Sequence, residues 1–379
     1  MQTGLWNELI DAGFEERIDH RSYKERGIEI EPQSKKGPVA TTYERKGLEL
    51  DVVIRHKDIA ARNAAFLSEN PEYFLRLVTA QKAVFTEDDL AREIHKRVGD
   101  DDFTPLFEKL RNSDELVRVG VRKWGPGKDD QKPLLTTRSQ LAMEQGLVER
   151  ADDMARSAVQ GAAMFPEYEI TNEMLSDEQR VAVAAMAAPN RLSVVTGYAG
   201  AGKSLAVSEA KRIWEDRGYE VYGAALAGKA VDELAKSSGV ESRTIASWDS
   251  RMISGSFTTS PKFVMVLDEA GMVGSRQMDG FMRRVEAAGG KLVLIGDAQQ
   301  LQPIASGAAL RAIADRVGDA TISTIRRQHD PEHREIAKAL ATSAPQAEIA
   351  IHRLDKRGEV VGHHSVDDAI GAIAGKMVE

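Results

Sequence analysis

A glycine-rich segment near the middle of the chain constrains the fold more than any other feature. Residues 191–204 read RLSVVTGYAGAGKS: an apolar, β-branched run, a glycine-rich turn, and the start of a run with helical periodicity. The residues that match the phosphate-loop pattern G-x-x-x-x-G-K-[ST] are Gly197, Gly202, Lys203 and Ser204. Glycines let consecutive backbone N–H groups face phosphate oxygens, and a helix N-terminus adds partial positive charge. The strand before and the helix after disfavour a chance glycine-rich turn.

Two side chains of this loop have the chemistry that a nucleoside triphosphate needs. The Lys203 ammonium can reach the β- and γ-phosphates, and the Ser204 hydroxyl can occupy one position on Mg²⁺. We therefore expect ATP and Mg²⁺ as cofactors.

Composition limits the remaining possibilities. The 379 residues are 42% hydrophobic and 29% charged, which is typical of a soluble protein of two or three domains. The sequence contains no cysteine, which excludes a disulfide framework and a thiolate zinc site. It also has no signal-peptide pattern and no apolar run of membrane-spanning length, so we expect a cytoplasmic protein without a membrane partner. The net charge of −8 argues against binding nucleic acid through bulk charge, although a local basic groove stays possible.

From Leu192 onward the pattern alternates between strand and helix. The expected strands are 192–196, 220–226, 262–268, 291–296 and 321–325, and the expected helices are 204–217, 229–236, 276–289 and a segment after Ser306. Such alternation predicts an α/β fold with a parallel, doubly wound sheet. Ligands of these sheets bind at the carboxyl ends of the strands, where the phosphate loop and three further polar segments fall.

Paired acids end one of these strands, VMVLDEAGMV. Asp268 is placed to hold Mg²⁺ through water, and Glu269 to orient or deprotonate an attacking water. Two exposed acids that merely end a strand are the alternative, which the phosphate loop disfavours.

Two later segments, LIGDAQQLQPI and TIRRQ, add polar groups at strand ends. Gln300 has an amide that can sense the γ-phosphate, and the Arg327 guanidinium can meet the charge that develops there. We interpret Asp297 as a residue that stiffens its turn and Arg326 as a solvated neighbour.

The first third of the chain has a different pattern. Residues 1–50 indicate short elements and loops, in which His20 is interpreted as a surface residue, and residues 51–120 are rich in helix periodicity. Two strand candidates joined by WGPGKDDQKP follow, which suggests a winged-helix-like domain. The basic residues at this wing are Arg122, Lys123, Lys128 and Lys132, beside Trp124. Contact with a nucleic-acid backbone and a solvated loop are equally good interpretations. Ser139–Met164 is expected to be one long connecting helix.

Taken together, the motifs carry a specific resemblance. Along the chain come LSDEQRVAV, GYAGAGKS, GAALAGKAVDEL, SRTIASW, VLDEAGMV, GDAQQLQPIASGAAL and IRRQ. In this order they resemble motifs Q, I, Ia, Ib, II, III and IV of RecD-like superfamily 1 helicases, with wording closest to the conjugative relaxase-helicases of the Ti-plasmid type, the TraA family. The DHRSY…RG…P…G run before residue 50 resembles the end of a MobA/MobL-type relaxase domain.

The resemblance assigns roles to individual residues. It implies that Gln179 reads the adenine, that the nucleotide contacts include Gly197, Gly200, Ala201, Gly202, Lys203, Ser204 and Leu205, and that Ser204 and Asp268 serve Mg²⁺. It implies catalytic roles for Lys203, Asp268, Glu269, Gln300 and Arg327. Single-stranded DNA would lie along Ala225, Lys229, Ser242, Thr244 and Trp248. For Trp248, a base-stacking platform and a core residue are equally compatible with the sequence.

The resemblance also predicts the domain organisation. We expect the C-terminal tail of a relaxase domain at 1–50, a winged-helix-like domain at 51–138, a helical connector at 139–170, a RecA-like P-loop motor domain at 171–328 and an incomplete start of a second motor domain at 329–379. His329 and His333 lack a third ligand and are interpreted as surface residues. The family's relaxase histidine cluster and helicase motifs V and VI have no counterpart in the sequence, so we expect a truncated piece.

Three functions remain to be compared. The first is an ATP-dependent DNA helicase module that binds single-stranded DNA and other conjugation (relaxosome) proteins. The second is a non-motor remnant that binds nucleotide or a partner protein without turnover. The third, an unrelated P-loop enzyme such as a kinase, is disfavoured because it would not need Gln300, Arg327 and the DNA-facing segments.

Overall fold

The computed structural model describes residues 31, 51–98, 100–123, 131–159, 168–198, 200–257, 261–297, 307–324, 336, 339, 344–363, 365, 368 and 370. The chain divides into two compact units: Met1–Arg150 with Gly274–Gly280 and Pro303–Ala309, and Ala151–Val273 with Phe281–Gln302 and Leu310–Glu379. Nowhere in the described ranges does a helix combine the length and the apolar composition that a membrane span requires.

The first unit is a small helical body with a two-stranded hairpin. Its elements are α3 (Asp51–Glu69), α4 (Pro71–Gln81), α5 (Glu87–His95), α6 (Asp100–Arg111), β1 (Leu116–Lys123), β2 (Gln131–Thr137) and the first part of α7 (Arg138–Arg156). β1 and β2 pair antiparallel, and Leu67, Phe74 and Leu90 belong to the buried core of the helices. Thr86 begins α5 with a capping box that it shares with Asp89. Helices followed by a hairpin are the order of elements that the sequence predicts here, and the winged-helix-like domain at 51–138 stays a prediction.

The basic wing is described only in part. Lys132 on β2 forms an ion pair with Asp88 on α5, so this cation has a partner within the unit. Trp124 and Lys128 lie outside the described residues, as do the side chains of Arg122 and Lys123. Both interpretations of the wing therefore stay predictions.

The connecting helix is shorter than expected. The sequence predicts a helix to Met164, but α7 ends at Arg156. Ala158 then forms a β-bridge with Asn190, and the Val159 side chain is buried in the core of the second unit. The extended conformation there gives Val159 a burial site and its backbone a partner, which outweighs the helical pattern.

The second unit is built on one six-stranded sheet. Its strands are β3 (Leu192–Gly197), β4 (Glu220–Ala225), β5 (Glu241–Thr244), β6 (Phe263–Leu267), β7 (Lys291–Gly296) and β8 (Ala320–Ile322). They lie in the order β5-β4-β6-β7-β3-β8 and every pairing is parallel. The strand β3 that leads into the phosphate loop therefore has neighbours on both sides.

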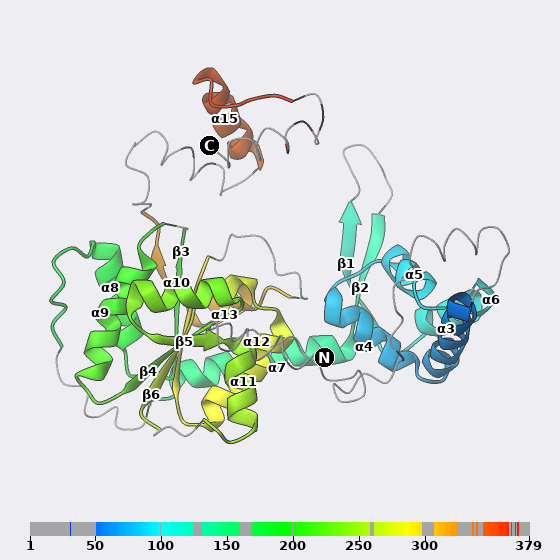
Figure 1. Ribbon diagram of the computed structural model, residues 1–379, viewed down its shortest axis with the longest axis horizontal. Helices are drawn as coiled ribbons and strands as arrows, with labels where there is room; N and C mark the ends of the chain where they lie inside the picture. Colours follow the sequence, from blue (N-terminus) through cyan, green and yellow to red (C-terminus); the bar gives the residue numbers. More distant parts are fainter. Residues whose placement is uncertain are drawn as a thin grey trace. The chain divides into compact units, whose positions relative to one another are not determined.

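Helices cover both faces of this sheet, as expected of a doubly wound α/β fold. They are α8 (Asp177–Ala187), α9 (Lys203–Glu215), α10 (Gly228–Ser238), α11 (Ile245–Ile253), the 3₁₀ turn η2 (Ala270–Met272), α12 (Ser275–Ala287) and α13 (Ala309–Val317). A further helix, α15 (Ala344–Lys356), follows later in the chain. Figure 1 shows α8 and α9 on one face of the sheet and α11 and α13 on the other. Every residue of β3, β6 and β7 is buried, which agrees with their largely apolar sequences.

The sequence missed two short elements of this unit. Glu241–Thr244 is an edge strand of four residues, and the helix α11 begins directly after it. The segment SRTIASW contains too few residues of either element for a periodicity to be visible. Pairing of β5 with β4 supplies the hydrogen bonds that define the strand.

Candidate nucleotide-binding site

The phosphate loop begins where the buried strand β3 ends and closes where α9 starts at Lys203. Gly200 has a φ of 80° and Gly202 a φ of 82° with a ψ of 30°, both in the left-handed region. An L side chain adopts this backbone only under strain, so the glycines of the motif meet a real conformational need. Ala201 is buried inside the loop, whereas Ala199 lies outside the described residues.

The side chain of Gln179, in the first turn of α8, supports this loop through hydrogen bonds. This side chain is fully buried, and its Nε2 donates to the carbonyl oxygens of Ala201 at 3.1 Å and Gly202 at 3.2 Å. Its Oε1 accepts a hydrogen bond from the backbone N–H of Ser176 at 2.9 Å. A Cβ on Gly202 would lie 2.3 Å from Nε2, so the glycine is also required by this contact.

This arrangement bears on the role expected of Gln179. Both ends of the Gln179 amide are engaged within the protein, and no part of the side chain is exposed. The resemblance places this glutamine at the adenine, whereas in this structure the capping box of α8 and the loop carbonyls engage both its amide oxygen and its NH₂. Adenine recognition by Gln179 therefore stays a prediction.

The Lys203 side chain extends from the start of α9 back to the first residues of the loop. Its Nζ donates to the carbonyl oxygens of Gly197 at 2.7 Å and Tyr198 at 3.1 Å. Burial lowers the pKa of this ammonium, and nearby carboxylates oppose that shift. These carboxylates belong to Asp268, Asp297 and Glu269. The ammonium is thus held at the loop by carbonyl acceptors that an anionic ligand can replace.

The paired acids after β6 have distinct environments. Asp268 is half-buried, and its Oδ1 accepts a hydrogen bond from the backbone N–H of Glu269 at 2.9 Å. Burial raises the pKa of Asp268, while the N–H donor and Lys203 act in the opposite direction. Burial also raises the pKa of Glu269, and the charges of Asp268 and Glu233 add to this effect.

Glu269 has an unusual backbone. Its φ is 51°, and among the described non-glycine residues it alone has a positive φ. A left-handed conformation in a side-chain-bearing residue costs on the order of 1–3 kcal/mol and is typical of functional sites. It turns the chain sharply between β6 and η2, directly at the carboxyl edge of the sheet.

The ends of β6 and β7 approach each other closely at this edge. A Cβ on Gly296 would lie 2.9 Å from the backbone nitrogen of Gly271 and 2.7 Å from Leu310 Cδ2. The close contact brings the Asp297 turn beside the paired acids. A cavity of about 320 Å³ lies farther along this edge, between the ends of β3, β7 and β8 and the helix α13. Its lining includes Gly197, Tyr198, Asp297, Arg311, Asp319 and Ser323, and it contains none of Lys203, Asp268 and Glu269.

The structure describes only some of the other residues that are expected to contact the nucleotide. Ser204 and Leu205 are half-buried in the first turn of α9, next to Lys203. Gln300 and Arg327 lie outside the described residues, as do Arg326, His329 and His333. Their roles stay predictions. Across the part of the chain that the structure describes, no group of three or more His, Cys, Asp or Glu side chains is placed to hold a metal ion.

Two of the five DNA candidates are buried. Trp248 is 1% exposed, its Nε1 donates to the Gly223 carbonyl at 2.7 Å, and its ring packs against Tyr222 and Phe257. Ala225 is fully buried at the end of β4. The interpretation of Trp248 as a base-stacking platform is therefore wrong for this structure, and the core interpretation holds. An aromatic cluster between β4, α11 and β6 accounts for its burial.

The other three DNA candidates are at least partly exposed. The Lys229 side chain is 90% exposed at the start of α10, 4.0 Å from Glu233. The Ser242 hydroxyl donates to the Val240 carbonyl, and the Thr244 hydroxyl caps α11. Thr244 and Ser242 thus have structural roles, while Lys229 has the exposure that a phosphate contact requires.

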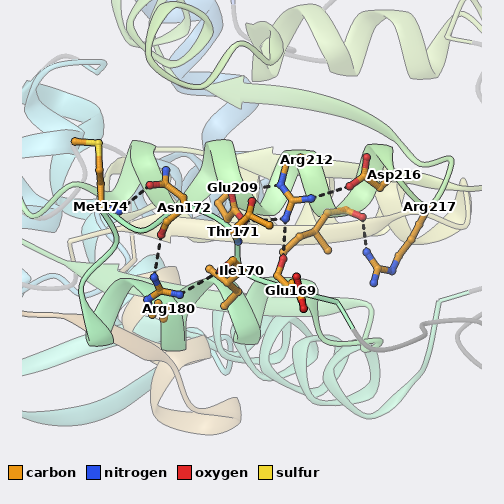
Figure 2. Close-up of polar contacts among 11 residues, drawn as sticks. Glu169, Ile170, Thr171, Asn172, Met174, Arg180, Glu209, Arg212, Asp216 and Arg217 are labelled. Atoms are coloured by element: carbon orange, nitrogen blue, oxygen red, sulfur yellow. Dashed lines mark hydrogen bonds and ion pairs between the residues drawn. The ribbon is translucent and has the colours of Figure 1, made fainter.

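A network that the sequence did not reveal anchors the segment before α8 (Figure 2). Arg180 on α8 donates to the Ile170 and Asn172 carbonyls at 3.3 and 3.0 Å. The Thr171 N–H donates to Glu209 on α9 at 2.8 Å. These bonds join backbone carbonyls and amides to residues up to 38 positions away, so no local pattern identifies them. They fasten the segment before α8 to both α8 and α9.

Two family models match the sequence. A model described as an AAA domain matches residues 174–365, which is just over half of the chain. A model of the MobA/MobL family matches residues 3–46. The second match confirms the resemblance of the DHRSY segment to the MobA/MobL family.

The chain is also similar to individual proteins. The conjugal transfer protein TraA of Rhizobium radiobacter is 36% identical over 367 residues, which cover 93% of this chain and 33% of that protein. The ATP-dependent RecD2 DNA helicase of Deinococcus radiodurans is 30% identical over 162 residues, 41% of this chain and 22% of that protein. The crystal structure of the Pif1 helicase from Candida albicans aligns with a TM-score of 0.35 and 21% identity, over 47% of each chain. The chain spans about one third of the length of the TraA proteins that it matches. With an AAA domain over residues 174–365 and a MobA/MobL match ahead of it, the chain belongs to the AAA-domain family and is a homologue of the conjugal transfer protein TraA.

Proposed function

We propose that this chain is an ATP-binding, single-stranded-DNA-binding helicase module of a conjugative DNA-transfer protein. The observation that carries the proposal is the carboxyl edge of one parallel sheet, where Lys203, Asp268 and Glu269 gather around a loop with left-handed glycines. Relatives with the names conjugal transfer protein and ATP-dependent DNA helicase support the same activity for this chain.

The residues at this edge fit ATP with Mg²⁺. Mg²⁺ typically takes one or two protein ligands and fills its other positions with phosphate oxygens and water, so a pair of ligands suffices. Ser204 and Asp268 would hold the ion, which when bound would offset the charge of the phosphates. Lys203 would exchange the carbonyls of Gly197 and Tyr198 for phosphate oxygens, which are stronger acceptors for an ammonium.

Glu269 is the general base in this proposal. A carboxylate with a raised pKa binds a proton more readily, and burial together with the charge of Asp268 raises the pKa of Glu269. Its carboxylate would orient the attacking water and accept its proton. Gln300 and Arg327 would sense the γ-phosphate and meet its developing charge, and these two assignments rest on the sequence motifs.

Nucleotide binding tests the site directly. Lys203→Ala removes a charged donor, which is worth about 1.5–3 kcal/mol, so the affinity for a fluorescent ATP analogue should fall about 10- to 150-fold. Lys236→Ala is the matched control, because this exposed lysine on α10 has the same charge and length. Equal binding by the wild type and Lys203→Ala would show that the site is assigned wrongly.

DNA binding tests the helicase part of the proposal. Single-stranded DNA should bind with an affinity that falls as salt rises, and Lys229→Ala should reduce the slope of log K against log salt by about 1. Fluorescence anisotropy with single-stranded and duplex oligonucleotides measures both. Binding to duplex that equals or exceeds binding to single strands would argue against the proposal.

A further inference from the structure

The left-handed backbone of Glu269 requires a structural cause. Its φ is 51° and its ψ is 32°, which is unfavourable for a residue that carries a side chain. Such a conformation persists only where the surrounding structure leaves no relaxed alternative. Glu269 lies between the buried strand β6 and the turn η2, so the contacts of this turn decide whether its backbone can relax.

Hydrogen bonds define the chain on both sides of Glu269. The backbone N–H of Asp268 donates to the Ala224 carbonyl of β4 at 2.9 Å, so the preceding residue is tied to the sheet. The Glu269 N–H donates to the Asp268 carboxylate at 2.9 Å, and the Glu269 carbonyl accepts from the N–H of Met272 at 2.9 Å. Both polar backbone groups of Glu269 thus have partners in the left-handed conformation.

Two glycines bring the end of β7 directly against the turn η2. A Cβ on Gly296, the last residue of β7, would lie 2.9 Å from the backbone nitrogen of Gly271 and 3.3 Å from that of Ala270. A Cβ on Gly271 would in turn lie 2.7 Å from the Asp297 carbonyl oxygen. No side chain fits between the two backbones, which therefore pack against each other.

This contact prevents Glu269 from relaxing. A change of its φ to a negative value would turn η2 about the end of β6, and the turn would then collide with Gly296 or move away from it. Movement away would expose Ala270 and Val273, which are both fully buried. The direction in which the Glu269 side chain leaves the backbone is thus set by the packing of η2 on β7.

We propose that Gly296 and Gly271 are positioning residues, which hold Glu269 in its left-handed conformation through their backbone contact and thereby aim its carboxylate at the attacking water. This inference rests on the proposed function, in which Glu269 is the general base. The two glycines act through Glu269 and not on the nucleotide. Their replacement should therefore slow the chemical step and leave nucleotide binding in place.

Gly296→Ala tests this contact through the kinetics of ATP hydrolysis. Its Cβ would displace the backbone of η2, and a displacement of about 1 Å in an active site can cost about 100-fold in rate. In the presence of single-stranded DNA, we expect kcat to fall about 10- to 100-fold while KM stays near the wild-type value, because only the transition state is affected. Gly271→Ala should have the same effect, since its Cβ would meet the Asp297 carbonyl oxygen.

Gly290→Ala is the matched control for a crowded core. This glycine directly precedes β7 at the other end of the same strand, and its Cβ would lie 2.3 Å from the Phe263 ring. The variant should be less resistant to urea than the wild type but should keep its kcat. Amide hydrogen exchange at Met272 and Val273 should accelerate in Gly296→Ala and stay near the wild-type rate in Gly290→Ala.

A double variant separates positioning from loss of stability. The Cβ of Gly296→Ala would also lie 2.7 Å from Leu310 Cδ2 on α13. Gly296→Ala/Leu310→Ala should resist urea better than the sum of the two single effects predicts, because the new methyl group occupies space that the leucine leaves. Its kcat should stay as low as that of Gly296→Ala, since the Cβ still meets the backbone nitrogen of Gly271.

The outcomes are distinguishable. A wild type without measurable ATP hydrolysis would refute the catalytic role proposed for Glu269, and this inference with it. If the wild type hydrolyses ATP and both Gly296→Ala and Gly271→Ala keep its kcat, the inference alone is refuted. An equal loss of kcat in Gly290→Ala, or a recovery of kcat in the double variant, would likewise overturn it, since either would show a general effect of crowding.

Discussion

Replacing Trp248 with phenylalanine removes one hydrogen bond from the core of the second unit. The indole Nε1 donates to the Gly223 carbonyl at 2.7 Å, and the side chain is 1% exposed. Phenylalanine keeps an aromatic ring against Tyr222 and Phe257 but leaves the buried carbonyl without this donor. The ring also becomes smaller, so a second cost comes from the unfilled volume.

A control substitution at Trp214 on α9 separates the cost of the lost hydrogen bond from the cost of the unfilled volume. Trp214 is fully buried in the same unit, and its Nε1 has no acceptor among the described residues. Trp214→Phe therefore loses a similar volume without losing a hydrogen bond. A buried polar group left without its partner costs about 1–3 kcal/mol, so Trp248→Phe should lower the free energy of unfolding by about that much more than Trp214→Phe.

Urea denaturation, monitored by far-UV circular dichroism, measures both free energies of unfolding. The two values can be compared if the free energy falls with urea concentration at the same slope in both variants. Single-stranded DNA binding should be unchanged in Trp248→Phe under conditions where the variant is folded. Equal destabilisation by the two substitutions would refute the role of the hydrogen bond. A stable Trp248→Phe variant that loses DNA binding would restore the stacking interpretation.

The remaining predictions concern one glycine and one carboxylate. Gly202→Ala should lower the free energy of unfolding by about 1–3 kcal/mol in urea denaturation, because the residue has a φ of 82° and its new Cβ would meet the Gln179 amide. Gly146→Ala, in the middle of α7 with open space around it, should instead raise it by about 0.5–1 kcal/mol, and a stabilising Gly202→Ala would contradict this reasoning. The lowered pKa of Glu178 contributes stability that is fully present above its ordinary value of 4.5 and is lost as the pH falls through the folded-state value. Thermal melting below pH 4.5 should therefore show a smaller acid-induced loss for Glu178→Gln than for the wild type, and identical pH profiles would rule this out.

The phosphate loop and the parallel sheet could be predicted from the sequence because their signals are local. A glycine pattern reports the backbone conformation that the loop itself needs, and Gly200 and Gly202 do adopt positive φ values. The largely apolar runs of β3, β6 and β7 indicate burial on both faces of each strand. The position of the acids at the end of β6 could also be predicted, because the carboxyl ends of the strands in a parallel sheet share one edge.

Contacts between distant residues decided the rest. The end of α7 at Arg156 depends on Val159 finding a place in the core, and the burial of Trp248 depends on a carbonyl 25 residues away. Gln179 and Glu178 are neighbours in one turn. Gln179 nevertheless binds the phosphate loop, 22 residues later in the sequence, and Glu178 binds the segment after β8, 145 residues later. A sequence pattern describes what a residue type can do. Which of its possible partners it meets is determined by the packing of the whole sheet, because hydrogen bonds and burial are satisfied only once all the elements are assembled.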